Sequence, residues 1–101
     1  ALSGKGDLNI EGVGKQKVDP ASFRRYSSMD EMIAKETLDY VDLVIPTYLH
    51  AEYAIRAMRA GLNVLCEKPM ALTIEECQAM IDAQKETGKQ LMIAQCLRFW
   101  P

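Results

Sequence analysis

The sequence has little of what several functional classes require. Its 101 residues hold 12 basic and 14 acidic side chains, for a formal net charge of −2. This balance lacks the positive excess typical of proteins that bind nucleic acid or anionic membranes. The longest apolar runs, such as residues 43–46, are too short to cross a bilayer. We therefore expect neither nucleic acid nor a membrane as a partner.

Cysteine is too sparse and too scattered for a metal site or a disulfide framework. Cys66, Cys77 and Cys96 form no C-x-x-C pair, and the single histidine, His50, is near none of them in the sequence. An odd cysteine count, with no apolar leader in residues 1–10, indicates reduced thiols and a cytoplasmic protein. We expect no bound metal and three cysteines that serve as small hydrophobic residues.

The first quarter of the chain lacks a sustained period. It holds four of the six glycines, as two G-x-G pairs at residues 4–6 and 12–14. Neither pair is followed by a third glycine at the spacing of a dinucleotide-binding loop, and no P-loop spacing is present. This composition predicts an irregular loop segment over residues 1–25, followed by a domain over residues 26–101.

Strand and helix signals alternate after residue 26. Short runs rich in β-branched and other apolar residues predict strands over residues 40–45, 63–67 and 90–95. Between the first two runs, Ala51, Ala54, Ile55 and Met58 recur at helical spacing, which predicts a helix over residues 50–60 that ends at Gly61.

Capping boxes of the form S/T-x-x-E mark two further helix starts. The first, at residues 28–31, predicts a short helix from Met29, and the second, at residues 73–76, a longer helix that Gly88 ends. The side chains expected on the buried faces are Met32 and Ile33 in the first helix and Ile74, Cys77 and Ile81 in the second.

The alternation predicts an α/β fold with a parallel sheet. Strands separated by a helix run parallel, and right-handed crossovers place both connecting helices on one face. Strands as apolar as these are expected to be covered on both faces, as in a doubly wound domain. Parallel strands also end at one edge, where ligands of open α/β sheets bind.

Three segments that leave the predicted strands should meet at that edge: residues 46–50, 67–69 and 95–98. Pro69 biases Lys68 toward an extended backbone, which aims an ammonium group that can polarise an oxygen or relay a proton. A plainer interpretation stays open for each polar residue. In this interpretation His50 is solvated surface, Glu67 and Lys68 form a solvated charge pair, and Arg98 covers Trp100.

At these residues the chain resembles the Gfo/Idh/MocA family of NAD(P)-dependent oxidoreductases. Residues 60–69, AGLNVLCEKP, are similar to the family's A-G-x-x-V-x-x-E-K-P signature. Residues 46–52 resemble its T-P-x-x-x-H-x-x motif, although Ile45 stands where the family usually has threonine before Pro46. Residues 95–99 resemble the segment in which an arginine follows the last parallel strand.

The resemblance implies an oxidoreductase that moves a hydride between NAD or NADP and a sugar or polyol-like substrate. It implies catalysis by Lys68 and contact of Arg98 with nicotinamide or substrate. It also implies that the full-length protein is a homo-oligomer. The cofactor-binding residues that it implies are Pro46, Thr47, His50, Glu67, Lys68 and Pro69.

The resemblance also implies that the chain is a fragment. The family's first βα unit, with its G-x-G-x-x-G/A turn, and its C-terminal substrate domain have no counterpart among these residues. Residues 26–101 are thus expected to be a partial, incomplete Rossmann-like domain, inactive alone. Two alternatives stay open: a non-catalytic binding or assembly module that retains half a Rossmann sheet, and an unrelated flavodoxin-like or response-regulator domain.

Overall fold

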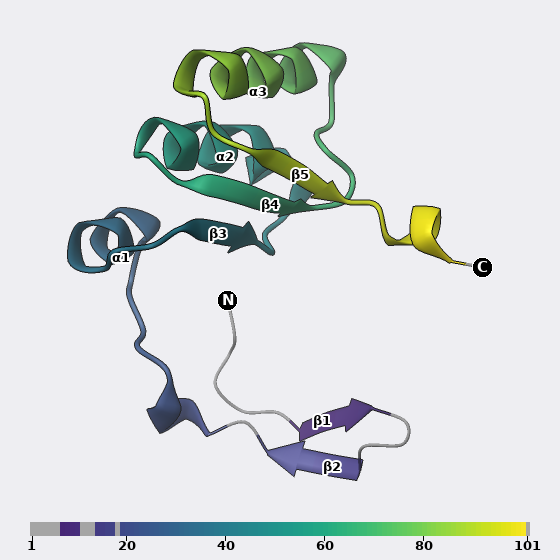
Figure 1. Ribbon diagram of the computed structural model, residues 1–101. Helices are drawn as coiled ribbons and strands as arrows, with labels where there is room; N and C mark the ends of the chain where they lie inside the picture. The colour runs from purple at the N-terminus through teal and green to yellow at the C-terminus, as the bar shows by residue number, and fades with distance from the viewer. Residues whose placement is uncertain (1–6, 11–13, 18, 101) are drawn as a thin grey trace. The chain divides into compact units, whose positions relative to one another are not determined.

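The chain divides into two compact units, Ala1–Glu36 and Thr37–Pro101. The structure, a computed structural model, describes residues 7–10, 14–17 and 19–100. The boundary therefore follows residue 36, whereas the sequence suggested one after residue 25. The second unit contains a sheet and two of the helices labelled in Figure 1.

The first unit contains an antiparallel pair of strands, β1 (Asp7–Ile10) and β2 (Gly14–Lys17). In their register Asp7 pairs with Lys17 and Ile10 with Gly14. The irregular loop predicted for residues 1–25 is therefore wrong for these two segments. Short connections that contain glycine are a hairpin signal, and this signal outweighs the weak periodicity of the flanking residues. The glycines at residues 4, 6 and 12 lie outside the described residues.

The helix predicted from the first capping box is confirmed as α1, Met29–Lys35. The Ser28 hydroxyl accepts a hydrogen bond from the backbone N–H of Glu31 at 3.1 Å. Met32 and Ile33 are half-buried, however, where the sequence predicted burial. A capping box specifies where a helix begins, but it says nothing about what packs against the helix.

The second unit has the predicted α/β architecture. Its parallel sheet has the strand order β3 (Tyr40–Leu43), β4 (Asn63–Glu67) and β5 (Leu91–Ala94). Helix α2 (His50–Arg59) connects β3 to β4, and α3 (Ile74–Thr87) connects β4 to β5. Strand β3 ends two residues earlier than predicted, because its ladder with β4 closes at Leu43 and Cys66.

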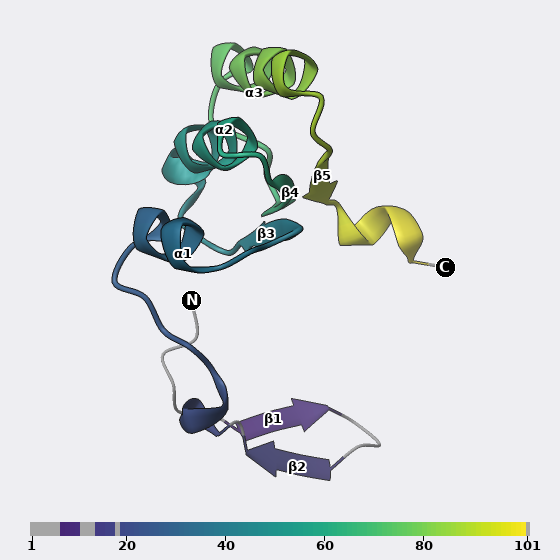
Figure 2. The same ribbon diagram turned by 60° about the vertical axis from the view of Figure 1, so that its left-hand side comes forward.

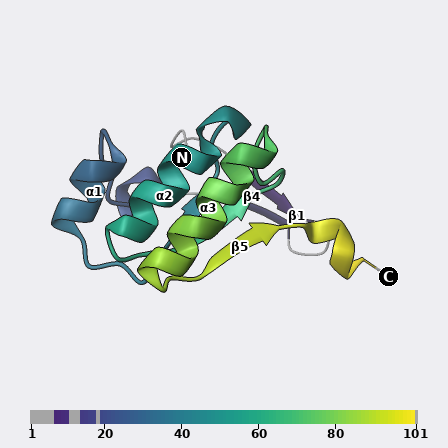
Figure 3. The same cartoon turned by 90° about the horizontal axis from the view of Figure 1, so that it is seen from above.

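Both connecting helices lie on the same face of this sheet (Figures 1 and 2). Helix α2 packs on β3 and β4, and α3 lies alongside α2, as the view from above shows (Figure 3). Small side chains allow this close packing, because Ala54 and Ala57 of α2 are fully buried. The core side chains of the strands are Val41, Leu43, Val64 and Cys66, which alternate with the outward-facing positions.

The buried face of α3 differs from the prediction. Met80 and Ala83 are buried, whereas Ile74 is 84% and Ile81 36% exposed and Cys77 is half-buried. Apolar residues occupy two overlapping stripes on this helix, so its sequence is compatible with either phase. Packing along α2 selects the phase that buries Met80.

The opposite face of the sheet carries large exposed side chains. Tyr40 is 60% and Met92 is 55% exposed, and both point away from the α2–α3 layer by strand alternation. The predicted cover on both faces is thus wrong within this unit, where both helices share one side. The reason is that the strands follow one another in the order β3, β4, β5, and two right-handed crossovers in the same direction along a sheet place both helices on the same face.

Candidate functional site

The carboxyl ends of the three parallel strands form one edge of the sheet. A 3₁₀ turn at Thr47–Leu49 follows β3, a turn at residues 67–69 follows β4, and a 3₁₀ turn at Cys96–Phe99 follows β5. The strands thus deliver all three predicted segments to the edge where open α/β sheets bind ligands.

His50 is a buried link between two of these segments. It is the first residue of α2 and is only 1% exposed, so the plain interpretation as solvated surface is wrong. Its ring nitrogen Nδ1 lies 2.8 Å from the carbonyl oxygen of Pro69. Its Nε2 lies 2.9 Å from the carbonyl oxygen of Ile45. The imidazole therefore spans the gap between the segment after β3 and the segment after β4.

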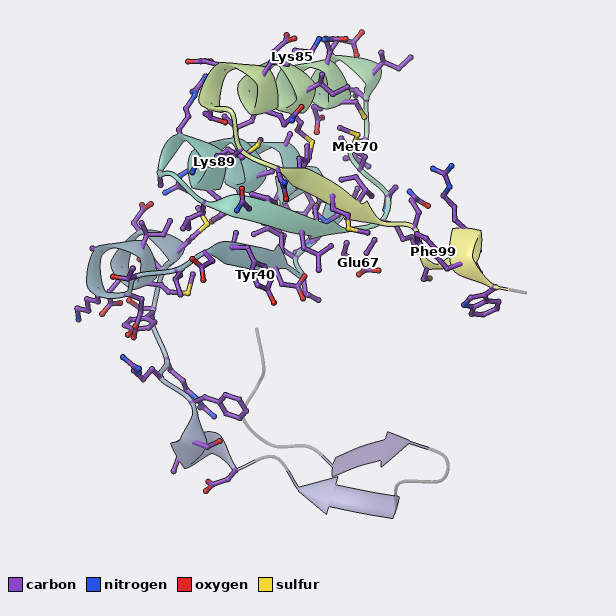
Figure 4. The ribbon with its side chains drawn as sticks, viewed as in Figure 1. Tyr40, Glu67, Met70, Lys85, Lys89 and Phe99 are labelled. Carbon is purple, nitrogen blue, oxygen red and sulfur yellow. The ribbon has the colours of Figure 1, made fainter. Side chains whose placement is uncertain are left out.

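The Glu67-Lys68-Pro69 turn presents its side chains outward. Glu67 ends β4 opposite Ala94 of β5 and is half-buried, while Lys68 and Pro69 are exposed. The Lys68–Pro69 peptide bond is cis. Figure 4 shows Glu67 on the side of the sheet away from α2 and α3, as Tyr40 is. The turn thus offers a carboxylate and an ammonium group to a molecule at this edge.

The segment after β3 adds a second, mainly backbone, wall. Pro46 is exposed and its carbonyl oxygen accepts a hydrogen bond from the N–H of Leu49 at 2.9 Å, which closes the 3₁₀ turn. Thr47 is half-buried at the start of that turn. The fixed φ of proline and this hydrogen bond hold the segment in one conformation beside the Ile45 carbonyl that His50 contacts.

Arg98 stands apart from the other candidate residues. It lies in the 3₁₀ turn after β5 and is exposed, as are Phe99 at 75% and Trp100 at 69%. In the part of the chain that the structure describes, no ion pair joins the Arg98 guanidinium to the carboxylate of Glu67. The β5 segment thus reaches the predicted edge but leaves the guanidinium free for a further partner.

Cys66 lies directly behind the site but has no chemistry to offer there. The side chain is fully buried, and its thiol lies 3.5 Å from the carbonyl oxygen of Glu67, to which it donates. Burial, followed by the charges of Glu67 and Asp42, raises the pKa of Cys66 to about 11. The thiol therefore stays protonated and acts as a core residue, as the sequence predicted.

The described residues include neither a cluster of three or more potential metal ligands nor a helix with the length and apolar character of a membrane span. The sequence did not reveal the part that two main-chain groups have in the site, the carbonyl oxygens of Ile45 and Pro69. No sequence pattern signals such acceptors, because every residue carries a carbonyl group.

An open parallel sheet whose strand ends meet at a polar loop edge places this chain in the α/β class of domains, which bind their ligands at that edge. The chain matches the model of an oxidoreductase family, described as having an NAD-binding Rossmann fold, over residues 11–95. The chain belongs to this family. The resemblance and the partial doubly wound fold inferred from the sequence are both confirmed.

Curated relatives in the family include two dehydrogenases. The chain is 41% identical over 76 residues to scyllo-inositol 2-dehydrogenase (NADP(+)) IolU of Bacillus subtilis, covering 75% of this chain and 23% of that protein. It is 38% identical over 76 residues to D-xylose 1-dehydrogenase (NADP(+)) 2 of Haloferax volcanii, with the same coverage of 75% and 23%.

A solved structure confirms the fold. The WlbA dehydrogenase from Bordetella pertussis, in complex with NADH and UDP-GlcNAcA, superimposes with a TM-score of 0.75 at 35% identity. The match covers 77% of this chain and 22% of that one. The chain therefore spans between a fifth and a quarter of the length of each of these three proteins.

Proposed function

We propose that the full-length protein is an NAD- or NADP-dependent oxidoreductase that transfers a hydride between the cofactor and a sugar or polyol-like substrate. The observation that carries this proposal is the Glu67-Lys68-Pro69 turn, set at the carboxyl end of β4 in a domain of an NAD-binding family. Relatives named as inositol and xylose dehydrogenases support the class of substrate.

The edge residues fit the nicotinamide half of such a cofactor. Pro46, Thr47 and the turn at residues 67–69 form two adjacent walls, held together beneath by the His50 ring. When bound, the nicotinamide ring supplies the hydride chemistry, while the protein positions the reactants. Glu67 and the loop backbone offer acceptors for ribose hydroxyl groups. The exposed Arg98 suits the nicotinamide amide or a polar group of the substrate.

Lys68 is the proposed proton-handling residue. Its ammonium group is exposed at the edge and forms no ion pair with any residue that the structure describes. During reduction of a carbonyl substrate, it donates a proton to the oxygen as the hydride reaches the carbon. During oxidation, the neutral amine takes the proton from the hydroxyl group as the hydride leaves.

The test is steady-state kinetics of the intact enzyme with myo-inositol and D-xylose as trial substrates and NAD⁺ or NADP⁺ as cofactor. We expect Lys68→Ala to lower kcat by about 10²- to 10⁴-fold with little change in the Kd for NADH or NADPH. Lys85→Ala is the matched control, because Lys85 is an exposed lysine on α3 and should keep normal turnover. Unchanged turnover in Lys68→Ala would reject the assignment.

Three further proposals concern the location, assembly and nucleic-acid binding of the full-length protein. The three cysteines Cys66, Cys77 and Cys96 are free thiols, which supports a cytoplasmic location. We also propose a homo-oligomer that does not bind nucleic acid, on the basis of the family and the slightly negative net charge of −2. Sedimentation of the intact protein, with and without added DNA, measures its oligomeric state and its binding to nucleic acid.

A further inference from the structure

The most unusual polar group in the molecule is His50. It is the single buried residue with a polar or charged side chain in the described part of the chain, at 1% exposure. Both ring nitrogens lie within hydrogen-bond distance of a carbonyl oxygen, at 2.8 Å and 2.9 Å. Neither ring nitrogen is therefore open to a hydrogen bond with a ribose hydroxyl group. Direct contact with the cofactor, which the family resemblance implied, does not fit this arrangement.

We infer that His50 is a positioning residue that couples the two cofactor-side loops and thereby sets the place of Lys68. Ile45 precedes Pro46, and Pro69 follows Lys68, so each carbonyl that the ring contacts is one residue from a proposed site residue. The inference rests on the proposed function, because it concerns how that site is assembled.

The position of the His50 ring in the fold allows it to hold the loops after β3 and β4 together. The β3–β4 ladder ends at the pair Leu43 and Cys66, and β4 itself ends at Glu67, which pairs with Ala94 of β5, so residues 44–46 and 68–69 lie beyond the sheet. The ring extends the connection past that point. His50 itself is held by α2, whose Ala54 and Met58 are buried at 0% and 1% exposure in the core. Through His50, both loops are thus attached to a rigid helix and not only to each other.

Loss of the ring should move the residues of the site without removing any group that contacts the cofactor. Without His50, the carbonyl oxygens of Ile45 and Pro69 lose their contacts with the ring, and a carbonyl group that accepted a hydrogen bond from it must turn toward water or another donor. That movement carries Pro46 and Lys68 with it. A misplacement of about 1 Å in a positioned catalytic group can lower the rate about 100-fold. The cofactor would lose no direct contact, so its affinity should change far less than kcat.

A double-mutant cycle in the intact enzyme tests this coupling. We expect His50→Asn, which retains one amide donor, to lower kcat by about 10- to 100-fold and to change the Kd for NADH less than about 3-fold. In the Lys68→Ala background the same substitution should lower kcat less than about 3-fold, because the group that it positions is absent. His50→Gln should recover part of the loss, since its longer side chain reaches further toward one carbonyl.

The opposite results would overturn the inference. If His50→Asn weakens NADH binding about 10-fold or more at unchanged kcat, His50 acts as a direct ligand. If its effect is equal with and without Lys68, it does not act through Lys68. If the wild type neither binds nicotinamide cofactors nor turns over, the proposed function fails, and the inference fails with it. Turnover with an additive cycle overturns the positioning role alone.

A crystal structure of the wild-type enzyme with bound NADH tests the same idea should the variants fail to fold. We expect both ring nitrogens of His50 to remain on the carbonyl oxygens of Ile45 and Pro69, with the ribose beyond contact distance. A ring nitrogen on a ribose hydroxyl group would overturn the inference.

Discussion

The phase of α3 leads to a sharp prediction about stability. Met80 is fully buried where α3 packs along α2, and replacement by alanine leaves a cavity there. Substitutions of this kind cost about 2–5 kcal/mol, and we take about 3 kcal/mol for Met80→Ala. Ile74 is 84% exposed, so Ile74→Ala should stay within about 0.5 kcal/mol of the wild type. The other phase, read from the sequence alone, predicts the reverse order.

Hydrogen–deuterium exchange of the intact protein, followed by mass spectrometry, measures the effect locally. A loss of about 3 kcal/mol corresponds to about 100-fold faster exchange of amides in α2 and α3 that open together. Met80→Leu, which keeps most of the volume, should lose less than about 1.5 kcal/mol. The described packing would be refuted if Ile74→Ala or Ile81→Ala increased exchange more than Met80→Ala.

Two further predictions concern a thiol and a helix cap. The pKa of Cys66, raised from 9.0 to about 11, leaves about 100-fold less thiolate at pH 8. Maleimide should label the exposed Cys96 first, and labelling of Cys66 should rise with pH up to about 11; equal labelling at pH 8 contradicts this. The raised pKa also means that the protonated thiol favours folding below pH 9, a contribution lost as pH rises toward 11. Thr73 Oγ1 accepts from the N–H of Glu76 at 3.1 Å. Thr73→Ala should thus cost α3 about 1 kcal/mol by exchange, Thr73→Ser much less, and equal effects would exclude the cap.

The second unit shows why much of this fold could be predicted. Local chemistry specifies helix starts, because Ser28 and Thr73 each cap the N–H three residues later. Gly88 ends α3 at a φ of 69°, a left-handed conformation that glycine adopts without steric cost. Alternation of strands with helices then requires parallel pairing, and parallel pairing brings the strand ends to one edge. Each step depends on neighbours in the sequence.

Other features depend on contacts between distant residues. The hairpin of β1 and β2 forms by backbone pairing, and its trace in the sequence is the short glycine-containing connection and not the pattern of the strand residues. Helix α3 carries two apolar stripes, and the choice between them was made by the surface of α2. Propensity and periodicity cannot rank such alternatives, because the free-energy difference comes from the packing partner.

The candidate site also has features that the sequence predicts and features that depend on the tertiary structure. The sequence by itself determined which residues reach the edge, since Lys68, Arg98 and Pro46 each follow a strand, and its motifs indicated the family that the comparisons confirm. Only the tertiary structure decided the role open to His50. Its partners are the main-chain carbonyl groups of Ile45 and Pro69, 5 and 19 residues away. Hydrogen bonds to backbone atoms are set by where the chain folds, so no pattern of side chains encodes them.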